Sequence, residues 1–348
     1  MMLYLHIPYC ESKCPYCAFN SFIGDRRQLP AYRDAAIKQL EWDLQRFKVE
    51  SISSLYIGGG TPSVVSAELL APLLARITPR LRPGAEATIE ANPSSFSPHW
   101  GEAVRKLGIN RLSLGVQSFN GQKLQTLGRR HSPQEAIAAL EAARSVGFEC
   151  ISVDLIYGVQ GDTLQSLKAD LALAEAAHHI SAYMLTLEPN TPFEARQELV
   201  SEDEELLRGF GAAIEQAGYP RYEVAAFGPP SSHNSGYWAG KPYLGIGCGA
   251  VGCVSQRRYM PSSDLLAYLN DPLFCHEECI DPAAWQMERV MLGLRCFLGI
   301  QQSWLQGEAL QRTKTLIAAG KLTLKGDRIY NPDYLIADAI ALYLLEGV

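Results

Sequence analysis

The chain has 348 residues, of which 47% are hydrophobic and 20% charged, and its formal net charge is −6 at pH 7. This length exceeds that of a typical single core and predicts one large domain with a smaller one appended. The net negative charge argues against a broad nucleic-acid-binding surface, so no nucleic-acid partner is expected. The sequence has neither an apolar run long enough to cross a bilayer nor a signal-peptide pattern, which predicts a soluble, cytoplasmic protein.

Apolar, β-rich segments alternate with amphipathic stretches along the first half of the chain. The predicted strands are residues 3–7, 54–60, 87–92, 111–117, 151–158 and 180–187, and the predicted helices are 31–47, 66–77, 98–107, 133–146 and 163–177. Strands that alternate with helices in this way form a parallel sheet whose crossovers are the helices. In such sheets, ligands bind where the carboxyl ends of the strands and their loops converge.

Three cysteines follow the first predicted strand, in the stretch CESKCPYC. Cys10, Cys14 and Cys17 are spaced C-x3-C-x2-C, and the other six of the nine cysteines are scattered. A structural zinc site normally has four protein ligands, and no second Cys/His pair at finger spacing lies nearby. Three thiolates can instead bind three irons of a cubane cluster and leave the fourth iron open to another ligand. The triplet therefore predicts an iron–sulfur cluster, with structural zinc as the alternative.

The other predicted strands also end in glycine or in a polar residue. In chain order these ends carry GGGTP, then Glu90 with Asn92, Gln117, Asp154 and Thr186. A polar residue can cap the exposed end of any strand, but the coincidence of all these cases favours a shared site. Glycines 58–60 allow the backbone to approach a ligand closely, and carboxylates at positions 90 and 154 can bond hydroxyl or amino groups.

The pattern changes to helices from about residue 283. A helix, a short strand, a turn at Lys325-Gly326-Asp327, a second strand and a last helix follow in a winged-helix-like order. Winged helices often bind DNA. The few basic residues in this region are scattered rather than stacked on one helix, which favours a packing role.

Several motifs together resemble the coproporphyrinogen III dehydrogenase-like branch of the radical S-adenosylmethionine (SAM) proteins. They include LYLHIPYCESKCPYCAFNS, GGGTPS, LSLGVQSFN, LGRRH, DLIYGVQGDT, HNSGYW and YLGIGCGA, and the resemblance runs from residue 3 to about residue 300. It implies an α/β fold, a partial (β/α)6 TIM-like barrel of the radical SAM type. The expected regions are the barrel at 1–220, a Gly-rich linking segment at 221–282, and a helical or winged-helix-like domain at 283–348.

The resemblance also implies the cofactors and their contacts. Cys10, Cys14 and Cys17 are expected to bind a [4Fe-4S] cluster, with SAM chelating its fourth iron. The residues that match the family's SAM contacts are Tyr4, Tyr16, Gly59, Gly60, Thr61, Glu90, Gln117, Arg129 and Asp154.

Two departures from the dehydrogenase point to a paralogous branch, the HemW-type haem chaperones. The dehydrogenase has a further cysteine two residues after the triplet, where this chain has Phe19, and it has a long amino-terminal extension, where only two residues precede LYLHIP here. The motif HNSGYW matches the haem-associated motif of the chaperones and assigns haem contacts to His233, Asn234, Tyr237 and Trp238. Without the resemblance, His233 and Asn234 would be expected to cap a turn, with Tyr237 and Trp238 docking the loop on the core.

The sequence thus predicts a haem chaperone that binds a [4Fe-4S] cluster, SAM and haem and delivers the haem to acceptor apo-proteins. An electron donor for the cluster is a further expected partner. The alternative is an oxygen-independent coproporphyrinogen III dehydrogenase, which would use radical SAM chemistry for oxidative decarboxylation to protoporphyrinogen IX. The sequence leaves open whether SAM is cleaved, whether the protein is a homodimer, and whether the acceptor is membrane-associated.

Overall fold

The computed structural model describes residues 1–201 and 203–346. Six parallel strands lie side by side in chain order and form the centre of a large sheet. They are β1 (Met2–Ile7), β2 (Ile52–Gly59), β3 (Leu81–Ala91), β4 (Arg111–Gln117), β5 (Cys150–Tyr157) and β6 (His179–Met184). All six predicted strands are therefore present. Asp154, expected at a strand end, lies within β5 instead.

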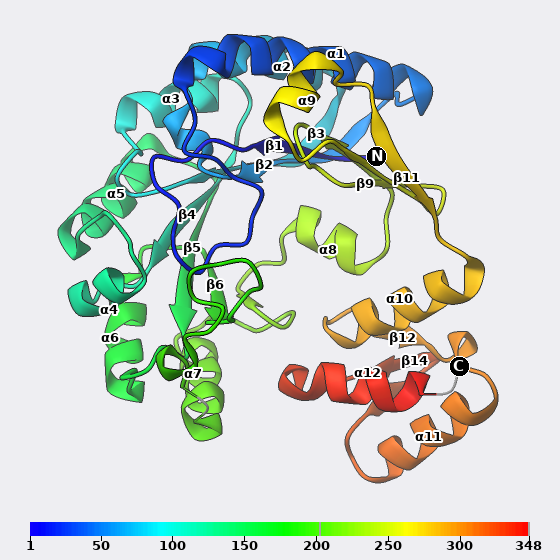
Figure 1. Cartoon of the computed structure of the whole chain (residues 1–348). Helices are drawn as coiled ribbons and strands as arrows, with labels where there is room; N and C mark the ends of the chain where they lie inside the picture. The colour runs from blue at the N-terminus through cyan, green and yellow to red at the C-terminus, as the bar shows by residue number, and fades with distance from the viewer. Residues whose placement is uncertain (202, 347–348) are drawn as a thin grey trace.

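Helices cover the convex side of the curved sheet (Figure 1). They are α1 (Leu29–Arg46), α2 (Ala67–Ile77), α3 (Pro98–Lys106), α4 (Gly121–Thr126), α5 (Pro133–Val146), α6 (Leu164–Leu173) and α7 (Glu204–Gln216). Local signals set their ends: α5 begins at a capping box formed by Ser132 and Glu135 and ends at Gly147, whose φ of 81° is left-handed. Short 3₁₀ helices are η1 (Arg26–Gln28), η2 (Pro62–Val64), η3 (Thr78–Arg80), η4 (Gln197–Leu199), η5 (Gln302–Trp304) and η6 (Tyr334–Ile336).

The two faces of the parallel strands differ in polarity. Side chains alternate between the faces of a strand, so Leu3 and Leu5 of β1 share the face that packs in the main core. The opposite face of β1 to β6 carries mostly polar side chains, among them Tyr4, His6, Ser54, Tyr56, Thr88, Glu90, Ser113, Ser152 and Asp154. A concave face of this composition suits a polar ligand better than a packed apolar core.

The sheet continues past both of its parallel edges. β8 (Tyr243–Ile246) pairs parallel with β1, followed by antiparallel β9 (Gly252–Val254), β10 (Arg257–Pro261) and β11 (Cys275–Cys279). β7 (Ala226–Phe227) pairs antiparallel with β6. The outermost strands, β7 and β11, do not pair with each other within residues 1–201 and 203–346, so the described barrel is open.

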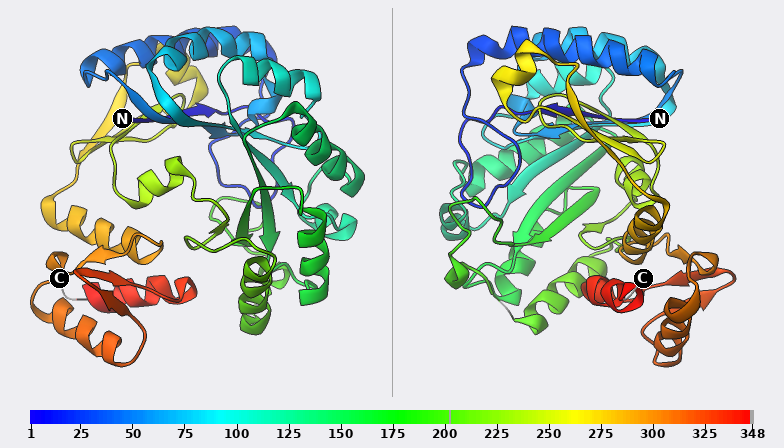
Figure 2. Two further views of the ribbon diagram at one scale, coloured as in Figure 1. Left: turned by 180° about the vertical axis from the view of Figure 1, so that it is seen from behind. Right: turned by 45° about the vertical axis from the view of Figure 1, so that its right-hand side comes forward.

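Residues 221–282 contain more structure than a Gly-rich linking segment implies. Besides β7 to β11 they include α8 (Ser232–Trp238) and α9 (Leu265–Asn270). These elements are at most seven residues long, too short for a clear periodic signal. Figure 1 and the left view of Figure 2 show α8 inside the curve of the sheet, and it contacts β2 and α10 (Pro282–Leu294).

The carboxyl-terminal elements enclose a second apolar core. It includes Val290, Leu294, Ile300, Ile329 and Leu344, all buried. The elements are α10, α11 (Gly307–Ala318), α12 (Ala337–Leu345) and a sheet of β12 (Ile300–Gln301), β14 (Arg328–Tyr330) and β13 (Thr323–Lys325). The predicted helix–strand–strand–helix order is present, although the last two residues of the predicted region, 347–348, lie outside the described residues. The described helices include none that is both long and apolar enough to span a bilayer.

Candidate functional site

Backbone hydrogen bonds close the loop that carries the three cysteines and tie it to the neighbouring loop. The Cys10 N–H donates to the carbonyl of Phe22 at 2.9 Å, and the Phe22 N–H donates back to the carbonyl of Pro8 at 2.7 Å. From the neighbouring loop, the Thr61 N–H donates to the carbonyl of Tyr9 at 2.8 Å. The cysteine loop and the GGGTP loop therefore form one platform at the carboxyl ends of β1 and β2.

A chain of hydrogen bonds connects two of the cysteine sulfurs. The Thr61 hydroxyl donates to Cys10 Sγ at 3.5 Å and accepts from Asn92 Nδ2 at 3.1 Å. Asn92 Oδ1 accepts from Arg129 Nη2 at 2.8 Å, and Arg129 Nη1 donates to Cys14 Sγ at 3.4 Å. The sequence places Asn92 at a strand end, but the predicted SAM contacts do not include it. Its position between Thr61 and Arg129 makes it part of the site.

The donor set around the triplet fits an iron–sulfur cluster. Cys10, Cys14 and Cys17 are free thiols and partly exposed, and N–H and O–H donors to sulfur are a recurrent means of tuning such clusters. Burial raises the pKa of the Cys10 and Cys17 thiols, so their thiolates need cations beside them, which iron would provide. Across the described part of the chain, no three Cys, His, Asp or Glu side chains converge closely enough to hold a single metal ion.

Two glycines allow the GGGTP loop to approach the cysteine loop. A Cβ on Gly60 would lie 2.7 Å from the carbonyl oxygen of Tyr9 and 3.0 Å from Cys10 Sγ. Gly59 has a φ of 116°, and a Cβ there would lie 2.4 Å from the His6 ring. Any side chain at either position would displace the cysteine loop or the strand beside it.

Glu90 lies at the carboxyl end of β3 beside the glycine loop. Its carboxylate accepts the Gly59 N–H at 3.0 Å and the Tyr56 hydroxyl at 2.7 Å. Burial raises the pKa of Glu90 to about 7, and the nearby charge of Asp154 acts in the same direction. Near neutral pH this carboxyl group is therefore divided between its protonated and ionised forms, which suits it to exchange a proton with an amino or hydroxyl group of a ligand.

We expect Glu90 to make stability depend on pH. Its pKa is about 7 in the folded chain against an ordinary value of 4.5, so the folded chain retains a proton that the unfolded chain releases between these values. The free energy of unfolding should therefore fall as pH rises through this window. The side chain in Glu90→Gln cannot ionise. The free energy of unfolding of this variant minus that of the wild type, measured in urea, should therefore increase from about pH 5 to about pH 8. A difference that is constant with pH would contradict the assignment.

A second variant locates the same window. The Tyr56 hydroxyl donates to Glu90 and lowers its pKa, opposing the effect of burial. Tyr56→Phe should therefore extend the upper end of the pH-dependent range of unfolding to higher pH, while the double variant with Glu90→Gln should lose the pH dependence.

Asp154 and Gln117 complete the polar edge on β5 and β4. The Ser113 hydroxyl contacts both carboxylate oxygens of Asp154, at 3.2 and 3.1 Å, and burial raises the pKa of Asp154 to about 6. Gln117 has a φ of 68°, unusual for a residue with a side chain, and the β4–β5 register shifts just before it. Built onto Gly115, a Cβ would lie 3.0 Å from Gln117 Nε2 and 3.1 Å from Asn92 Oδ1, so the two amides lie together over this glycine.

The two predicted SAM-contact tyrosines have different surroundings. The Tyr4 hydroxyl is hydrogen-bonded to His6 Nδ1 at 2.7 Å, and His6 Nε2 is hydrogen-bonded to the carbonyl of Asn20 at 2.7 Å. Tyr16, within the cysteine loop, packs its ring 6.4 Å from that of Phe193. Tyr4 thus lies on the concave face, whereas Tyr16 packs against an apolar cluster and also interacts with Cys14 and Arg129.

The motif HNSGYW forms α8, so the turn considered for it is wrong. The cap is Ser231, whose hydroxyl accepts the Asn234 N–H, rather than His233 or Asn234. His233 is completely buried: Nδ1 lies 2.9 Å from the Ser54 hydroxyl and Nε2 lies 3.1 Å from the Tyr237 hydroxyl. In this conformation neither ring nitrogen is free to bind iron. Tyr237 and Trp238 are half-buried.

Glu86 of β3 anchors this helix and was not indicated by the sequence. Its carboxylate accepts the hydroxyl of Ser231 at 2.7 Å and the N–H groups of Ser232 at 2.8 Å and His233 at 3.2 Å. A carboxylate at a helix amino terminus stabilises it through these unpaired N–H groups. The Tyr56 ring lies 5.4 Å from the His233 ring, and since Tyr56 also binds Glu90, the helix is linked to the glycine-loop side of the site.

Solved structures support the fold. Coproporphyrinogen III oxidase (HemN) from Escherichia coli, described as a radical SAM enzyme, superposes with a TM-score of 0.83. The alignment covers 100% of this chain and 90% of the other, at 22% sequence identity. At this identity the likeness establishes a shared fold, so the predicted α/β, radical SAM type of architecture is confirmed.

Sequence comparisons identify the family. The model of the radical SAM superfamily matches residues 4–174. Heme chaperone HemW of Haemophilus influenzae is 40% identical over 268 residues, which are 72% of this chain and 70% of the relative. Heme chaperone HemW of Mycobacterium tuberculosis (strain H37Rv) is 33% identical and covers 99% of this chain and 94% of its own length. The chain therefore belongs to the HemW family of the radical SAM superfamily.

Proposed function

We propose that this protein is a haem chaperone that binds a [4Fe-4S] cluster, SAM and haem, and delivers the haem to acceptor apo-proteins. The observation that carries the proposal is the hydrogen-bonded chain from Cys10 through Thr61, Asn92 and Arg129 to Cys14. It places donors at two of the three cysteine sulfurs, beside polar groups from five parallel strands. The names of the relatives, heme chaperone HemW, supply the haem part of the proposal.

The cluster would be held by Cys10, Cys14 and Cys17. When bound, it supplies a one-electron redox centre with one iron that no cysteine of the triplet ligates. Thr61 and Arg129 donate hydrogen bonds to two of the sulfurs and would stabilise negative charge there. An electron donor for the cluster remains a predicted partner.

SAM would bind between Arg129 and Glu90. Both terminal nitrogens of Arg129 have partners, but its Nε is buried with no hydrogen-bond partner in the described structure. An unsatisfied guanidinium donor at this position fits a ligand carboxylate. Glu90 would accept the ligand's amino group, and the backbone of Gly59 and Gly60 would allow its close approach. Tyr4, Tyr16, Gln117 and Asp154 remain predicted contacts around these groups.

Haem would bind at α8. Burial, with the charge of Arg111, lowers the pKa of His233 to about 3, so the imidazole is neutral. Its contacts with Ser54 and Tyr237 make it a positioning residue for the helix in this conformation. Tyr237 and Trp238 are the partly accessible aromatic side chains of the motif. Ligation of the haem iron by His233 stays a prediction that requires its Nε2 to leave Tyr237.

The competing assignment is an oxygen-independent coproporphyrinogen III dehydrogenase. The likeness to the Escherichia coli oxidase shows the shared fold and does not carry this activity to the chain. The dehydrogenase is expected to have a further cysteine at position 19. In this chain the residue is Phe19, whose surface is 69% exposed.

One anaerobic experiment separates the two assignments. The reconstituted protein is incubated with coproporphyrinogen III, SAM and a low-potential reductant, and the tetrapyrroles are then analysed by chromatography. A parallel sample is titrated with haem. We expect saturable haem binding and no conversion of coproporphyrinogen III. Formation of protoporphyrinogen IX by a protein that does not bind haem would overturn the proposal.

A further inference from the structure

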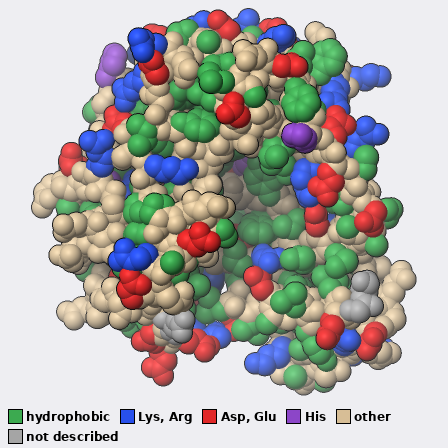
Figure 3. Space-filling view, viewed as in Figure 1, with side chains coloured by type: hydrophobic (Ala, Val, Ile, Leu, Met, Phe, Trp, Pro, Cys, Tyr) green, Lys and Arg blue, Asp and Glu red, His purple; other side chains and the backbone are tan. Residues whose placement is uncertain are grey.

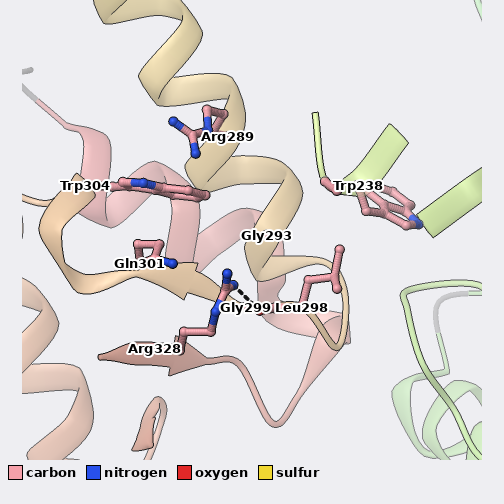
Figure 4. A pocket seen from close by; sticks show the side chains of 9 residues that line it. Trp238, Arg289, Gly293, Leu298, Gly299, Gln301, Trp304 and Arg328 are labelled. Atoms are coloured by element: carbon pink, nitrogen blue, oxygen red, sulfur yellow. Dashed lines mark hydrogen bonds between the residues drawn. The ribbon is translucent and has the colours of Figure 1, made fainter. Parts of the chain in front are cut away.

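A cavity of about 250 Å³ lies between α8 and the carboxyl-terminal elements (Figure 4). Trp238, the last residue of the HNSGYW motif, forms one side of it. The opposite side belongs to α10, β14 and the segment around β12, none of which was assigned a ligand from the sequence. The side chains that matter here are Arg289, Leu298, Gln301, Trp304 and Arg328.

Two arginines line this cavity without a carboxylate partner. The Arg289 guanidinium carbon lies 3.7 Å from the centre of the Trp304 ring. Arg328 donates to the carbonyl of Leu298 at 2.7 Å and, with the Gln301 amide oriented to satisfy its neighbours, to that side chain at 3.1 Å. Many other arginines form ion pairs with Asp or Glu, but among the described residues neither Arg289 nor Arg328 does.

The chemistry of these walls suits a flat, anionic ligand. Indole rings offer apolar faces to a planar ring system, and guanidinium groups recognise carboxylates through paired hydrogen bonds. Two unpaired cations beside two indoles therefore match a ring that carries two carboxylates. Figure 4 shows Trp238 on α8 at one side of the cavity and Arg289, Trp304 and Arg328 at the other.

We propose that this cavity binds the carboxylate-bearing edge of a tetrapyrrole, with its two propionate groups at Arg289 and Arg328. The proposal rests on the proposed haem-chaperone function and assigns it a subsite. A volume of about 250 Å³ is below the roughly 300–1,000 Å³ of pockets that enclose a whole drug-sized ligand, so the cavity would take one edge of the ring. Figure 3 shows a hollow in the middle of this face with hydrophobic side chains beside it, and the remainder of the ring would extend toward it.

This assignment divides the haem site between two regions of the chain. The motif helix supplies Trp238, and the carboxyl-terminal elements supply both cations. The carboxyl-terminal region would then bind ligand directly in addition to packing against α8 through α10. Movement of this region relative to α8 would open the cavity, which is a physical route for releasing a bound ring.

The test compares haem with its dimethyl ester, which has the same ring and iron but no propionate charge. The full chain is reconstituted anaerobically and titrated with each compound. We expect the wild type to bind haem about tenfold or more tightly than the ester, since two charge-assisted contacts are lost with the ester. The double variant Arg289→Gln with Arg328→Gln should weaken haem binding by about tenfold or more and leave ester binding unchanged.

Two further variants control for charge and folding. Lys325→Gln removes a cation from the strand paired with Arg328, at a residue that does not line the cavity, and should leave haem binding unchanged. Arg289→Lys with Arg328→Lys should recover part of the affinity lost in the glutamine variant. If the double variant does not fold, the comparison of haem with its ester in the wild type decides the question alone.

Failure of the subsite and failure of the function give different results. Equal affinity of the wild type for haem and its ester, or wild-type haem affinity in the double glutamine variant, would overturn the subsite and leave haem binding intact. A wild type that binds neither compound would overturn the proposed function and the subsite with it.

Discussion

Cys14→Ala is expected to yield a protein with almost no bound iron after anaerobic reconstitution. Only three cysteines lie in the loop that would hold the cluster, so removing one leaves two irons without a protein ligand from the triplet. Cys14 is also the sulfur to which Arg129 donates, and its loss leaves that buried guanidinium with one fewer acceptor. Iron and acid-labile sulfide analysis should give about four of each per wild-type chain and close to none in the variant.

Cys279→Ala is the matched control for this experiment. Cys279 is an exposed free thiol on β11, outside the cysteine loop, and its removal should leave the iron content at the wild-type value. Full iron content in Cys14→Ala would contradict the assignment of the triplet. Loss of iron in both variants would point to general thiol oxidation instead of a defined cluster site.

His233→Ala is expected to lower the free energy of unfolding by about 2–4 kcal/mol and to weaken haem binding. The side chain is completely buried, so the variant leaves a cavity and removes the partners of the Ser54 and Tyr237 hydroxyls. Since α8 loses a contact at its first turn, Tyr237 and Trp238 would no longer be held in place. Urea unfolding measures the first effect, and haem titration of the folded variant at low temperature measures the second.

The chain contains a close control for this variant in His179. That ring is also completely buried, and its nitrogens lie 2.8 Å from the Ser152 hydroxyl and 2.9 Å from the Tyr222 hydroxyl. Burial, with the charge of Arg111, lowers its pKa to about 3, as it does for His233. His179→Ala should therefore cost similar stability and leave haem binding nearly unchanged. Equal loss of haem binding in both variants would show that His233 acts through stability alone.

Tyr237→Phe distinguishes positioning from ligation by His233. It removes the hydroxyl that occupies Nε2 and keeps the imidazole in place. If His233 only positions the helix, the Soret spectrum of bound haem should be the same in the wild type and in Tyr237→Phe. A shift in Tyr237→Phe that disappears when His233 is also replaced by Ala would show that the imidazole can reach the iron.

The strands that build the site could be predicted because each combines an apolar, β-rich run with a distinct end. Gly58 to Gly60, Glu90 and Gln117 were expected at carboxyl ends, and they do lie together at one edge of the parallel sheet. Asp154 was expected at the end of its strand and lies three residues before it, since strand boundaries depend on pairing with neighbours.

The support for α8 could not be predicted, because it depends on contacts between distant residues. Glu86 and Ser231 are separated by 145 positions, and Ser54 and His233 by 179. No local pattern marks Glu86 as a helix anchor. The strands after α8 are three to five residues long and pair only in the folded sheet, which is why residues 221–282 resemble a linker in sequence.

The cavity at Trp238 was missed for a similar reason. No sequence pattern distinguishes Arg289 and Arg328 from other arginines, and the scattered basic residues of this region favour a packing role. Only the fold places both beside Trp304 and opposite Trp238. A ligand site made from two separate regions leaves no compact motif in either.

Haem delivery is tested most directly by measuring haem transfer from the haem-loaded, cluster-reconstituted protein to an apo-haemoprotein acceptor. The change in the Soret spectrum reports the rate of transfer. Delivery through a complex predicts that the transfer rate rises with acceptor concentration until it saturates. Passive release predicts a rate set by haem dissociation alone. A rate independent of acceptor concentration for every acceptor tried, or haem that stays with the protein, would contradict the account.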